Sequence, residues 1–474
     1  MASPTPVVPY YRRRRRSLAG PLVLIIVGVF SLLGTTGVIT WPQFGHYFAR
    51  YWPLLLILWG AVRLAEYYSD KAHGCPTRSI GAGGVIFLIF LIIFGISSKN
   101  AENVNWQGLR AEMDVDDDNP FGGIFGQTYT FNASQQQDIP ALKGDVTVRV
   151  LNDRGAVTMM AWDENKVKVD VEKKLRANDQ GEAGKIDQQT QPTISIDGNV
   201  ITVNANTTGS GPRGIRSDME VWVPRSVAAD ISTQRGDITV SGRNANVKVS
   251  DSRGDITIDD VTGNVDAEQR RGDVRISKVT GAVSVDGRAD ETTISEINGP
   301  VKLNGEYLNG LNLSKISKQV VFQSSRTTME IASLPGDLTM DGGDLRAGNL
   351  AGPVKVLTRS KDIHLDDLTG ELRIENANGA VEVHSTKLGP IDISNRKGDV
   401  QVSVPEKSAF QVDFKTRNGD ITSDFSGLKV STQQNDSVAT GTVGSGGPRV
   451  QINNEYGNIE IRKAGAPEQE SGKD

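Results

Sequence analysis

Cysteine is nearly absent from this sequence of 474 residues, in which Cys75 is the single example. One thiol excludes an intramolecular disulfide framework and any zinc or iron–sulfur site built from several cysteines. Histidine is also scarce, with four residues, and aromatic residues make up 6% of the chain. Few aromatic rings leave little material for a groove that stacks sugars. The sequence therefore predicts architecture and location more directly than catalytic chemistry.

Positive charge is depleted in the larger part of the chain. The formal net charge is −5, but residues 1–99 carry +8 and the remainder carries −13. An acidic body offers no general basic face, so we expect no nucleic-acid partner. The basic charge instead accompanies long uncharged, apolar runs, which points to a membrane.

Two uncharged runs are long enough to cross a bilayer, which needs about 20 residues. They are residues 18–39 and 79–98, and the first is too long and lacks the cleavage site expected of a secretory signal. A shorter apolar segment lies between them at about 48–65, where Arg50, Trp52 and Arg63 can place their polar ends at the interface. We predict a transmembrane region over 18–98 with three spans.

Charge asymmetry orients these spans. A basic tail at 1–17 contains Arg12, Arg13, Arg14, Arg15 and Arg16. Three spans keep this tail and the loop after the second span on the same side, whereas two spans would lose most of the bias. Because Lys and Arg favour the cytoplasmic side, we expect a multi-pass protein of the cytoplasmic membrane whose C-terminal body is extracytoplasmic.

The apolar sequence GPLVLIIVGVFSLLGTTGVI, followed by YWPLLLILWGAVRL, resembles the paired transmembrane helices of LiaF-like bacterial membrane proteins. The resemblance covers about residues 18–68 and implies a role in envelope-stress signalling. The third span is an addition to the two-helix pattern. Beyond it, residues 99–127 are acidic and Gly-rich and predict a flexible linker.

The body is dominated by a nine-residue repeat. Turn residues begin units at Gly236, Ala245 and Gly254, and the repeat continues through Gly299 before a less regular stretch at 305–342. After each turn comes a short strand with apolar residues at its second and fourth positions, which is typical of a half-buried strand. Such a unit closes no core alone, so the repeat predicts an all-β, single-chain β-solenoid at 128–463.

The coil and the ends of the domain follow from the same pattern. An Arg-Gly-Asp triplet recurs every 18 residues, at Arg235, Arg253 and Arg271, which favours two units per coil and leaves a three-faced coil open. The flanks at 144–172 and 192–204 also alternate as strands, with a polar loop expected at about 174–190. Residues 464–474 are polar and predict a disordered tail.

The body as a whole resembles the bacterial adhesin-like family of single-chain β-solenoids. The similarity is carried by GDVTV at Gly144, WVP at Trp222, RNGDITSDF at Arg417 and YGNIEI at Tyr456. It covers about residues 130–463. The resemblance implies the β-solenoid fold, whereas adhesion is a much weaker implication because folds host many functions.

The triplets invite an adhesive interpretation, but we favour a structural one. Gly supplies the backbone conformation of a tight corner and Asp can accept hydrogen bonds from its amides. The residues assigned to structural turns are Gly236, Asp237, Gly254, Asp255, Gly272 and Asp273. The spacing also departs from the nonapeptide repeats that bind calcium. His364 and His384 occupy different positions in their units, so a metal pair is not expected.

These observations predict a non-catalytic protein without a cofactor. We expect a membrane-anchored, extracytoplasmic β-solenoid that acts as a scaffold or regulator in cell-envelope homeostasis. The alternative is a surface adhesin or ligand-binding module that the helices merely anchor. The expected partners are the lipid bilayer and another envelope or membrane protein, and a homo-oligomer is compatible with the sequence.

Overall fold

The computed structural model of the chain describes residues 127–139, 145–207 and 215–464. The chain divides into two compact units, Met1–Asp114 and Val115–Asp474, and the described residues all belong to the second. They form a mixed sheet of 27 strands and one α-helix, α5 (Gln180–Gln189). The prediction of a mostly β-strand C-terminal region is confirmed.

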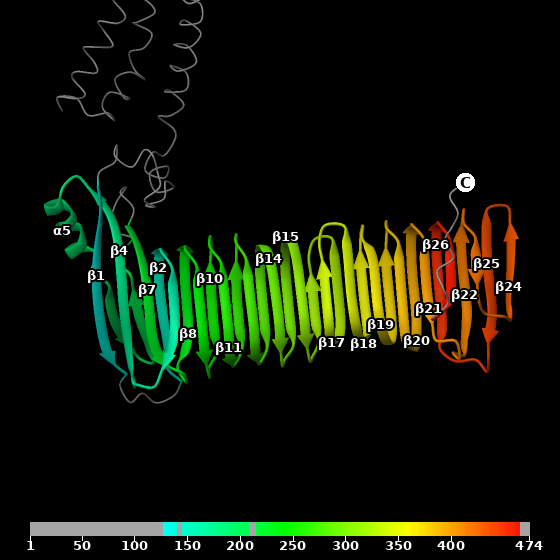
Figure 1. Cartoon of the computed structure of the whole chain (residues 1–474), viewed down its shortest axis with the longest axis horizontal. Coiled ribbons are helices and arrows are strands. Elements are labelled where there is room, and N and C mark those ends of the chain that lie inside the picture. Colours follow the sequence, from blue (N-terminus) through cyan, green and yellow to red (C-terminus); the bar gives the residue numbers. More distant parts are fainter. Residues whose placement is uncertain (1–126, 140–144, 208–214, 465–474) are drawn as a thin grey trace, which may run out of the picture. The chain divides into compact units, whose positions relative to one another are not determined.

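Two strand–turn units make one coil in the regular part of the sheet (Figure 1). Val247 pairs with Val265, and Ile256 pairs with Val274, so residues 18 positions apart lie side by side in parallel register. The strands consequently alternate between two faces. The spacing of the Arg-Gly-Asp triplets therefore reflects a two-unit coil rather than a three-faced one.

Each face is a continuous series of paired strands. The first face contains, in spatial order, β5 (Thr193–Asp197), β6 (Val200–Asn204), β2 (Thr147–Arg154), β8 (Ala228–Arg235), β10 (Val247–Asp251), β12 (Val265–Gln269), the first parts of β14 (Val283–Ile297) and β15 (Val301–Ile316), β16 (Val320–Gln323), the first part of β17 (Thr327–Met340), the second parts of β18 (Asp344–Thr358), β19 (Asp362–Asn376) and β20 (Val381–Lys397), then β26 (Arg449–Tyr456), β22 (Phe410–Arg417), β25 (Asp436–Val443) and β24 (Leu428–Gln433). The second face contains β1 (Gln127–Asp138), β4 (Lys166–Ala177), β7 (Ile215–Pro224), β3 (Val157–Trp162), β9 (Ile238–Arg243), β11 (Ile256–Thr262), β13 (Val274–Thr280), the remaining parts of β14, β15, β17, β18, β19 and β20, then β21 (Val400–Val404), β27 (Ile459–Lys463) and β23 (Ile421–Ser423).

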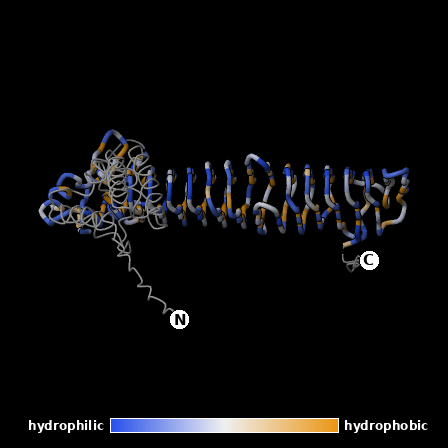
Figure 2. Tube along the Cα trace, turned by 90° about the horizontal axis from the view of Figure 1, so that it is seen from above, coloured by the Kyte–Doolittle hydropathy of each residue, from blue (hydrophilic) through white to orange (hydrophobic). Residues whose placement is uncertain are grey.

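Alternation along each strand decides which side chains enter the interior. In β13, Val274 and Ile276 are buried, whereas Arg275 between them is exposed. The same alternation of hydrophobic and hydrophilic positions recurs along the stack (Figure 2). Each fully buried Val or Ile contributes about 1.5–3 kcal/mol to folding relative to an exposed position. The narrow interior is thus filled mainly by branched aliphatic side chains from both faces.

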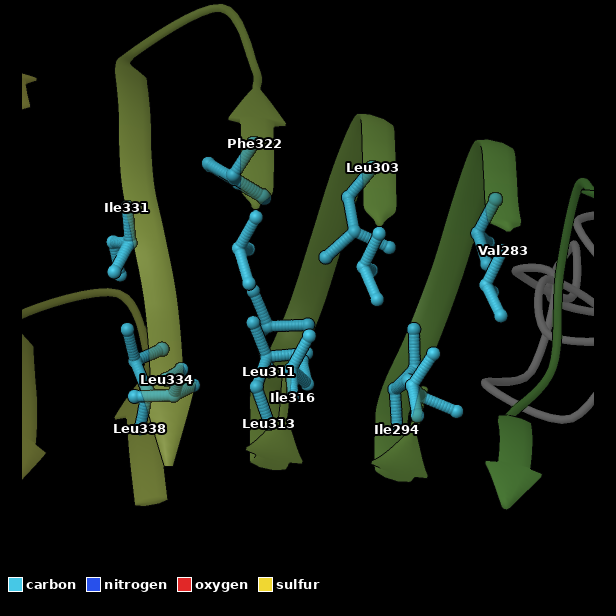
Figure 3. Close-up of a cluster of buried hydrophobic side chains, with 14 of the residues drawn as sticks. Val283, Ile294, Leu303, Leu311, Leu313, Ile316, Phe322, Ile331, Leu334 and Leu338 are labelled. Carbon is cyan, nitrogen blue, oxygen red and sulfur yellow. The ribbon is translucent and has the colours of Figure 1, made fainter. Parts of the chain in front are cut away.

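The irregular stretch at 305–342 is where strand direction reverses. β16 and β17 form an antiparallel hairpin, and β17 also pairs antiparallel with β15 and β18. Figure 3 shows that Leu303, Phe322 and Ile331 come from three of these strands and lie in one buried cluster. The hydrophobic interior therefore continues through the reversal, although the 18-residue register does not.

Both ends of the sheet contain strands that are out of chain order. At the C-terminal end, β26 and β27 lie between a coil made by β20 and β21 and another made by β22 and β23. Val450 pairs with Ile391 on one side and with Val412 on the other. At the N-terminal end, β2 pairs with β8 although Val148 and its partner Ala229 are far apart in sequence. Distant segments thus complete both ends.

The polar loop predicted at about 174–190 is wrong. β4 continues to Ala177, and α5 follows directly. Asp179 caps the helix by accepting a hydrogen bond from the Glu182 N–H at 2.8 Å. Ala183 is the single fully buried residue of the helix, so its apolar periodicity was too weak to indicate a helix from sequence.

No helix formed by the described residues is long and apolar enough to cross a membrane. The three predicted spans at 18–39, 48–65 and 79–98 lie outside those residues.

Candidate functional site

The predicted turn glycines lie above one another along one corner of the stack. Gly236, Gly254 and Gly272 connect the end of a first-face strand to the next second-face strand. Their φ angles are +138°, +151° and +126°, a region that residues with a side chain rarely adopt. A Cβ added at Gly254 would lie 2.5 Å from the carbonyl oxygen of Gly236. Successive coils therefore approach too closely at Gly254 to leave room for a side chain.

The aspartates of the triplets connect successive coils. The N–H of Asp255 donates to Oδ1 of Asp237, and the N–H of Asp273 donates to Oδ1 of Asp255, both at 2.9 Å. Glu291 continues the series by donating its N–H to Asp273. Each carboxylate thus accepts a backbone hydrogen bond that the turn geometry would otherwise leave unmade. This arrangement gives the triplets a structural role at the corner.

A column of polar side chains runs inside the same corner, three residues before the turn residue, which is glycine except after Thr358, where it is Lys361. We call it the corner column, and its members are Asn152, Thr233, Asp251, Gln269, Thr358, Asn376, Asn395, Thr416 and Asn454. Asn395 shows the common role, since its Nδ2 donates to the carbonyl oxygens of Gly379 and Gly398. The column satisfies turn carbonyls that face the apolar interior. In the sequence, most members are polar residues three positions before a turn glycine, a feature that the alternation of apolar residues does not single out.

Asp251 is the acidic member of the corner column. One carboxylate oxygen accepts the hydroxyl of Thr233, and the other has no hydrogen-bond partner among the described residues. Burial raises the pKa of Asp251, while hydrogen bonds from Thr233 and from nearby backbone amides oppose that rise. The side chain is 2% exposed, so it contacts no solvent-borne substrate. We therefore regard Asp251 as a structural residue.

A second buried charge lies at the other corner. Arg243 donates from its guanidinium to the carbonyl oxygens of Val223, Pro224 and Val227. Burial lowers its pKa to about 10, and the nearby charge of Arg225 acts in the same direction. The three carbonyls belong to the end of β7 and the turn after it. Arg243 therefore closes a turn rather than a binding site.

An open groove of about 750 Å³ lies along the first face, between the β16–β17 hairpin and the pair formed by β22 and β25. We call it the arginine groove. Its basic lining residues are Arg326, Arg359, Arg396, Lys415 and Arg417, and its acidic ones are Glu375, Asp436 and Glu455. The remaining lining is mostly Ser, Thr and Asn. It includes five members of the corner column, Thr358, Asn376, Asn395, Thr416 and Asn454. No element of the repeat pattern indicated this groove from sequence.

The charges of the arginine groove are unevenly compensated. Glu375 pairs outside the groove with Arg373 at 2.6 Å, and Asp436 faces Arg417 at 3.5 Å. In the described part of the chain, Arg326, Arg359 and Arg396 have no carboxylate within ion-pair distance. Arg396 makes one long hydrogen bond, from Nε to the carbonyl oxygen of Ala377 at 3.5 Å. The groove therefore exposes cationic groups that are free to bind an anion.

The two histidines of the body meet through a shared carboxylate on the second face. Nδ1 of His364 lies 3.0 Å from Oε2 of Glu382, and Nε2 of His384 lies 3.3 Å from Oε1 of the same residue. Asp366 lies 2.9 Å from the other nitrogen of His384. The two histidines occupy different positions within their nine-residue units, so the sequence did not predict that they lie close together. The neighbouring strands β19 and β20 bring them together. Within the described ranges, no group of His, Cys, Asp and Glu has an arrangement that could hold a metal ion.

Comparison with known families identifies the stacked sheet. The toastrack DUF4097 family model matches residues 149–462, which is most of the chain. The chain belongs to the toastrack DUF4097 family. A model of the LiaF transmembrane domain matches residues 19–109. Both predicted resemblances are therefore confirmed, and a toastrack domain and a LiaF-type membrane domain occur in one chain.

Comparisons with individual proteins add less. The toastrack domain is similar to a crystal structure of a candidate cell adhesion protein from Clostridium sporogenes ATCC 15579, at 9% identity and a TM-score of 0.17. The match covers 71% of this chain and all of that one. No curated protein matches the chain.

The residues predicted to set membrane topology all precede the toastrack domain. They match the LiaF transmembrane region in part, but they lie outside the described residues. They are Arg12, Arg13, Arg14, Arg15, Arg16, Arg50, Trp52 and Arg63. Cys75 belongs to the same region. The match suggests membrane anchoring, and the number and direction of the spans stay predictions.

Proposed function

We propose that this protein is a non-catalytic, membrane-anchored scaffold or regulator in cell-envelope homeostasis. Its β-solenoid lies on the outer side of the cytoplasmic membrane, and its helices associate laterally with another membrane protein. The observation that carries the proposal is the presence of a LiaF-type transmembrane domain and a toastrack domain in one chain. A stiff stack of coils is suited to holding or sensing an envelope partner at a distance from the bilayer.

The charge distribution supports the proposed orientation. Residues 1–99 carry +8, mostly in the arginine tail and around the second apolar segment, while the remainder carries −13. Three spans with a cytoplasmic N-terminus keep eight of these ten basic residues inside, leave Arg50 and Lys99 outside, and send the acidic body out. The lipid bilayer is then the first partner, and a homo-oligomer is a further possibility for the membrane helices.

The buried polar groups of the toastrack domain support a non-catalytic role. Asp251, Arg243 and Lys361 are buried groups with shifted pKa values, and each binds a turn carbonyl or a neighbouring column residue. His384 is held between two carboxylates, and its side chain is exposed on the second face. A general acid–base pair needs a pocket that positions a substrate against it. The arginine groove is instead wide and open, and two of its three carboxylates, Glu375 and Asp436, are paired with arginines.

The alternative function is a surface adhesin or ligand-binding module. The arginine groove favours it, because free cations in a concave surface are suited to binding an anionic ligand. In this alternative the helices serve only as an anchor.

Exchanging the membrane region separates the two functions. Replacing residues 1–98 with an unrelated three-span anchor of the same orientation should abolish a regulatory phenotype, measured as the response of an envelope-stress reporter in the native host. The control is the amount of each protein in the membrane fraction, which should be the same for the chimera and the parent. If the first chimera still restores the wild-type response, the helices are only an anchor and the regulator proposal is wrong.

Topology is tested with the lone thiol. An impermeant maleimide applied to spheroplasts should leave Cys75 unlabelled, because three spans place its loop in the cytoplasm. A Cys75→Ser variant carrying Ser445→Cys, in an exposed turn of the toastrack domain, should be labelled. The reverse pattern would place the domain in the cytoplasm and contradict the proposed location.

A further inference from the structure

We infer that the arginine groove binds a linear acidic polysaccharide, whose carboxylates pair with arginines on alternate strands. The inference deepens the proposed function, since it rests on an extracytoplasmic domain for access to envelope polymers. The binding itself depends only on the groove.

The arginines recur regularly along the stacking direction. Thr358, Asn376, Asn395, Asn454 and Thr416 pair in series across neighbouring strands. The residues that follow them are, in the same order, Arg359, Ala377, Arg396, Glu455 and Arg417. Neighbouring strands are about 4.8 Å apart, so the three arginines recur at about 9.6 Å. Ala377 separates the first two arginines and Glu455 the last two. Arg417 faces Asp436 at 3.5 Å, so a ligand carboxylate replaces that partner when it binds there.

This spacing suits an extended polymer better than a compact ligand. The lining residues come from β17, β18, β19, β20, β22, β25 and β26, and the groove runs across all of these strands. One small anion would engage only one of the three positions. A chain whose anionic groups recur at a comparable distance can engage all three, and linked contacts add affinity without new chemistry at each position.

The chemistry of the lining favours a carboxylated sugar. Guanidinium groups pair with carboxylates through two parallel hydrogen bonds. Hydroxyl and amide side chains, among them Ser325, Thr328, Ser394 and Asn453, also line the groove and can exchange hydrogen bonds with sugar hydroxyls. None of the lining residues is aromatic, so a neutral sugar would find no ring on which to stack. Recognition therefore depends on the acidic groups.

Buried hydrogen bonds of the corner column hold the backbone beneath the groove in place. Nδ2 of Asn376 donates to the carbonyl oxygen of Lys361 at 2.9 Å, and Nδ2 of Asn454 donates to that of Gly398 at 2.9 Å. These buried bonds fix the strand ends from which the arginines project. A fixed backbone lowers the entropy lost when a ligand orders the side chains. Electrostatics also localise the polymer, because the domain is acidic apart from such patches.

Binding is tested with the full chain in detergent micelles and with polygalacturonate oligosaccharides as the probe. The variant combines Arg359→Ala, Arg396→Ala and Arg417→Ala. The control combines Lys248→Ala, Arg288→Ala and Lys302→Ala, which remove the same charge from exposed first-face positions outside the groove. Calorimetric titration should show about tenfold or greater loss of affinity for the groove variant, and about twofold or less for the control. Equal losses, or no binding by the parent protein, would overturn the inference.

Two further arms identify the chemistry. Inorganic polyphosphate of similar length should bind more weakly than polygalacturonate, and neutral dextran should not bind. Stronger binding of polyphosphate would overturn the carboxylate assignment. A second variant with Arg→Lys at the same three positions keeps the charge but loses the paired hydrogen bonds. It should lose affinity while keeping the parental unfolding temperature, and unchanged affinity would contradict arginine-specific pairing. Because purified protein is used, these results are independent of the topology experiment.

Discussion

The central coils and the two ends of the toastrack domain are built by different rules. In the centre, β8 to β14 pair with strands 18 residues away, so each coil is complete soon after its residues enter the stack. At the ends, coils are completed by distant segments, such as β2 with β8 and β26 with both β20 and β22. The centre is therefore a local structure repeated, whereas each end depends on long-range closure.

The difference has a structural reason. A stack of coils exposes unpaired backbone groups at its last strands, which would pair with another chain. Here the N-terminal end is covered by β1 and β4 on one face and by the β5–β6 hairpin on the other, with α5 packed against β4. At the C-terminal end, the β24–β25 hairpin covers the first face. We regard the out-of-order strands as the means by which the chain protects both ends.

The largest expected effect comes from removing the inserted C-terminal coil. A chain that ends at residue 448 lacks β26 and β27, which pair on both sides with neighbouring coils. Residues 381–448 should lose hydrogen-exchange protection, while β8 to β13 should keep theirs because nearest-neighbour contacts carry their stability. Mass-spectrometric hydrogen exchange on the full-length parent and the truncated chain measures both regions.

A chain that ends at residue 464 serves as the control, since it retains every described strand. Loss of protection throughout the domain in the shorter chain would mean that the centre depends on the ends, and that the comparison is wrong.

The second effect concerns the N-terminal end, where a buried ion pair holds α5. The side chain of Lys173 is 1% exposed, and its Nζ lies 2.8 Å from Oδ1 of Asp187, with a further contact to Thr190. Lys173→Met leaves the Asp187 carboxylate without its partner, which costs about 3–5 kcal/mol for a buried pair. Exchange of the α5 amides should therefore become faster.

The adjacent Lys174→Met removes an exposed pair with Glu172, for which about 0–1 kcal/mol is expected. Similar exchange rates in the two variants would show that α5 is held by other contacts.

The third effect sharpens the role of glycine in the central coils. Gly254→Ala introduces a Cβ 2.5 Å from the Gly236 carbonyl oxygen at a φ of +151°. Backbone strain of this kind costs about 1–3 kcal/mol, and the clash adds to it. The urea midpoint of the toastrack domain in the full chain should fall.

Gly184→Ala in α5 is the matched control, because nothing lies within 4 Å of its added Cβ. Helix propensity predicts no loss of stability there, and a gain of about 0.5–1 kcal/mol is possible for an interior helical position. A loss of equal size at both positions would show that the corner imposes no special demand.

Sequence reasoning was accurate where the structure is local. Gly236, Gly254 and Gly272 mark turns whose partners lie one coil away, so periodicity alone located them. Periodicity could not locate β26. Its Val450 pairs with Ile391 and Val412, which belong to two coils that come earlier in the chain. Helix α5 was missed because an ion pair and a cap stabilise it, rather than an apolar face.

The candidate site was hidden for a related reason. Arg359, Arg396 and Arg417 share no sequence interval, because β26 separates the strands that carry the last two. Only the spatial order of the strands places them on alternate positions of one groove. The histidines illustrate the same point, since Glu382 joins two side chains that differ in their offset within the repeat.

The smallest expected effect tests the corner column at its one acidic position. Asp251→Asn replaces a buried carboxylate with the amide found in the equivalent positions of Asn376 and Asn395. Because burial raises the pKa of Asp251, the folded state keeps the proton at pH values where the unfolded chain, with a pKa of about 3.9, has lost it. The stability of the parent therefore falls as the pH rises above about 4. The variant should lack this dependence and be more stable at neutral pH by about 1 kcal/mol, the net contribution of one hydrogen bond.

Urea unfolding of the full chain at pH 4 and pH 7 measures this difference. Asp255→Asn is the control, because its side chain is half exposed and its remaining oxygen can still accept the Asp273 N–H. The stability gap between Asp251→Asn and the parent should open toward neutral pH, whereas that of the control should stay near zero. A gap that is constant with pH would show that Asp251 acts through its hydrogen bonds to Thr233 and the backbone rather than through its charge. In that case the column would tolerate a buried carboxylate at no electrostatic cost, and the difference between its acidic and amide members would lie in packing alone.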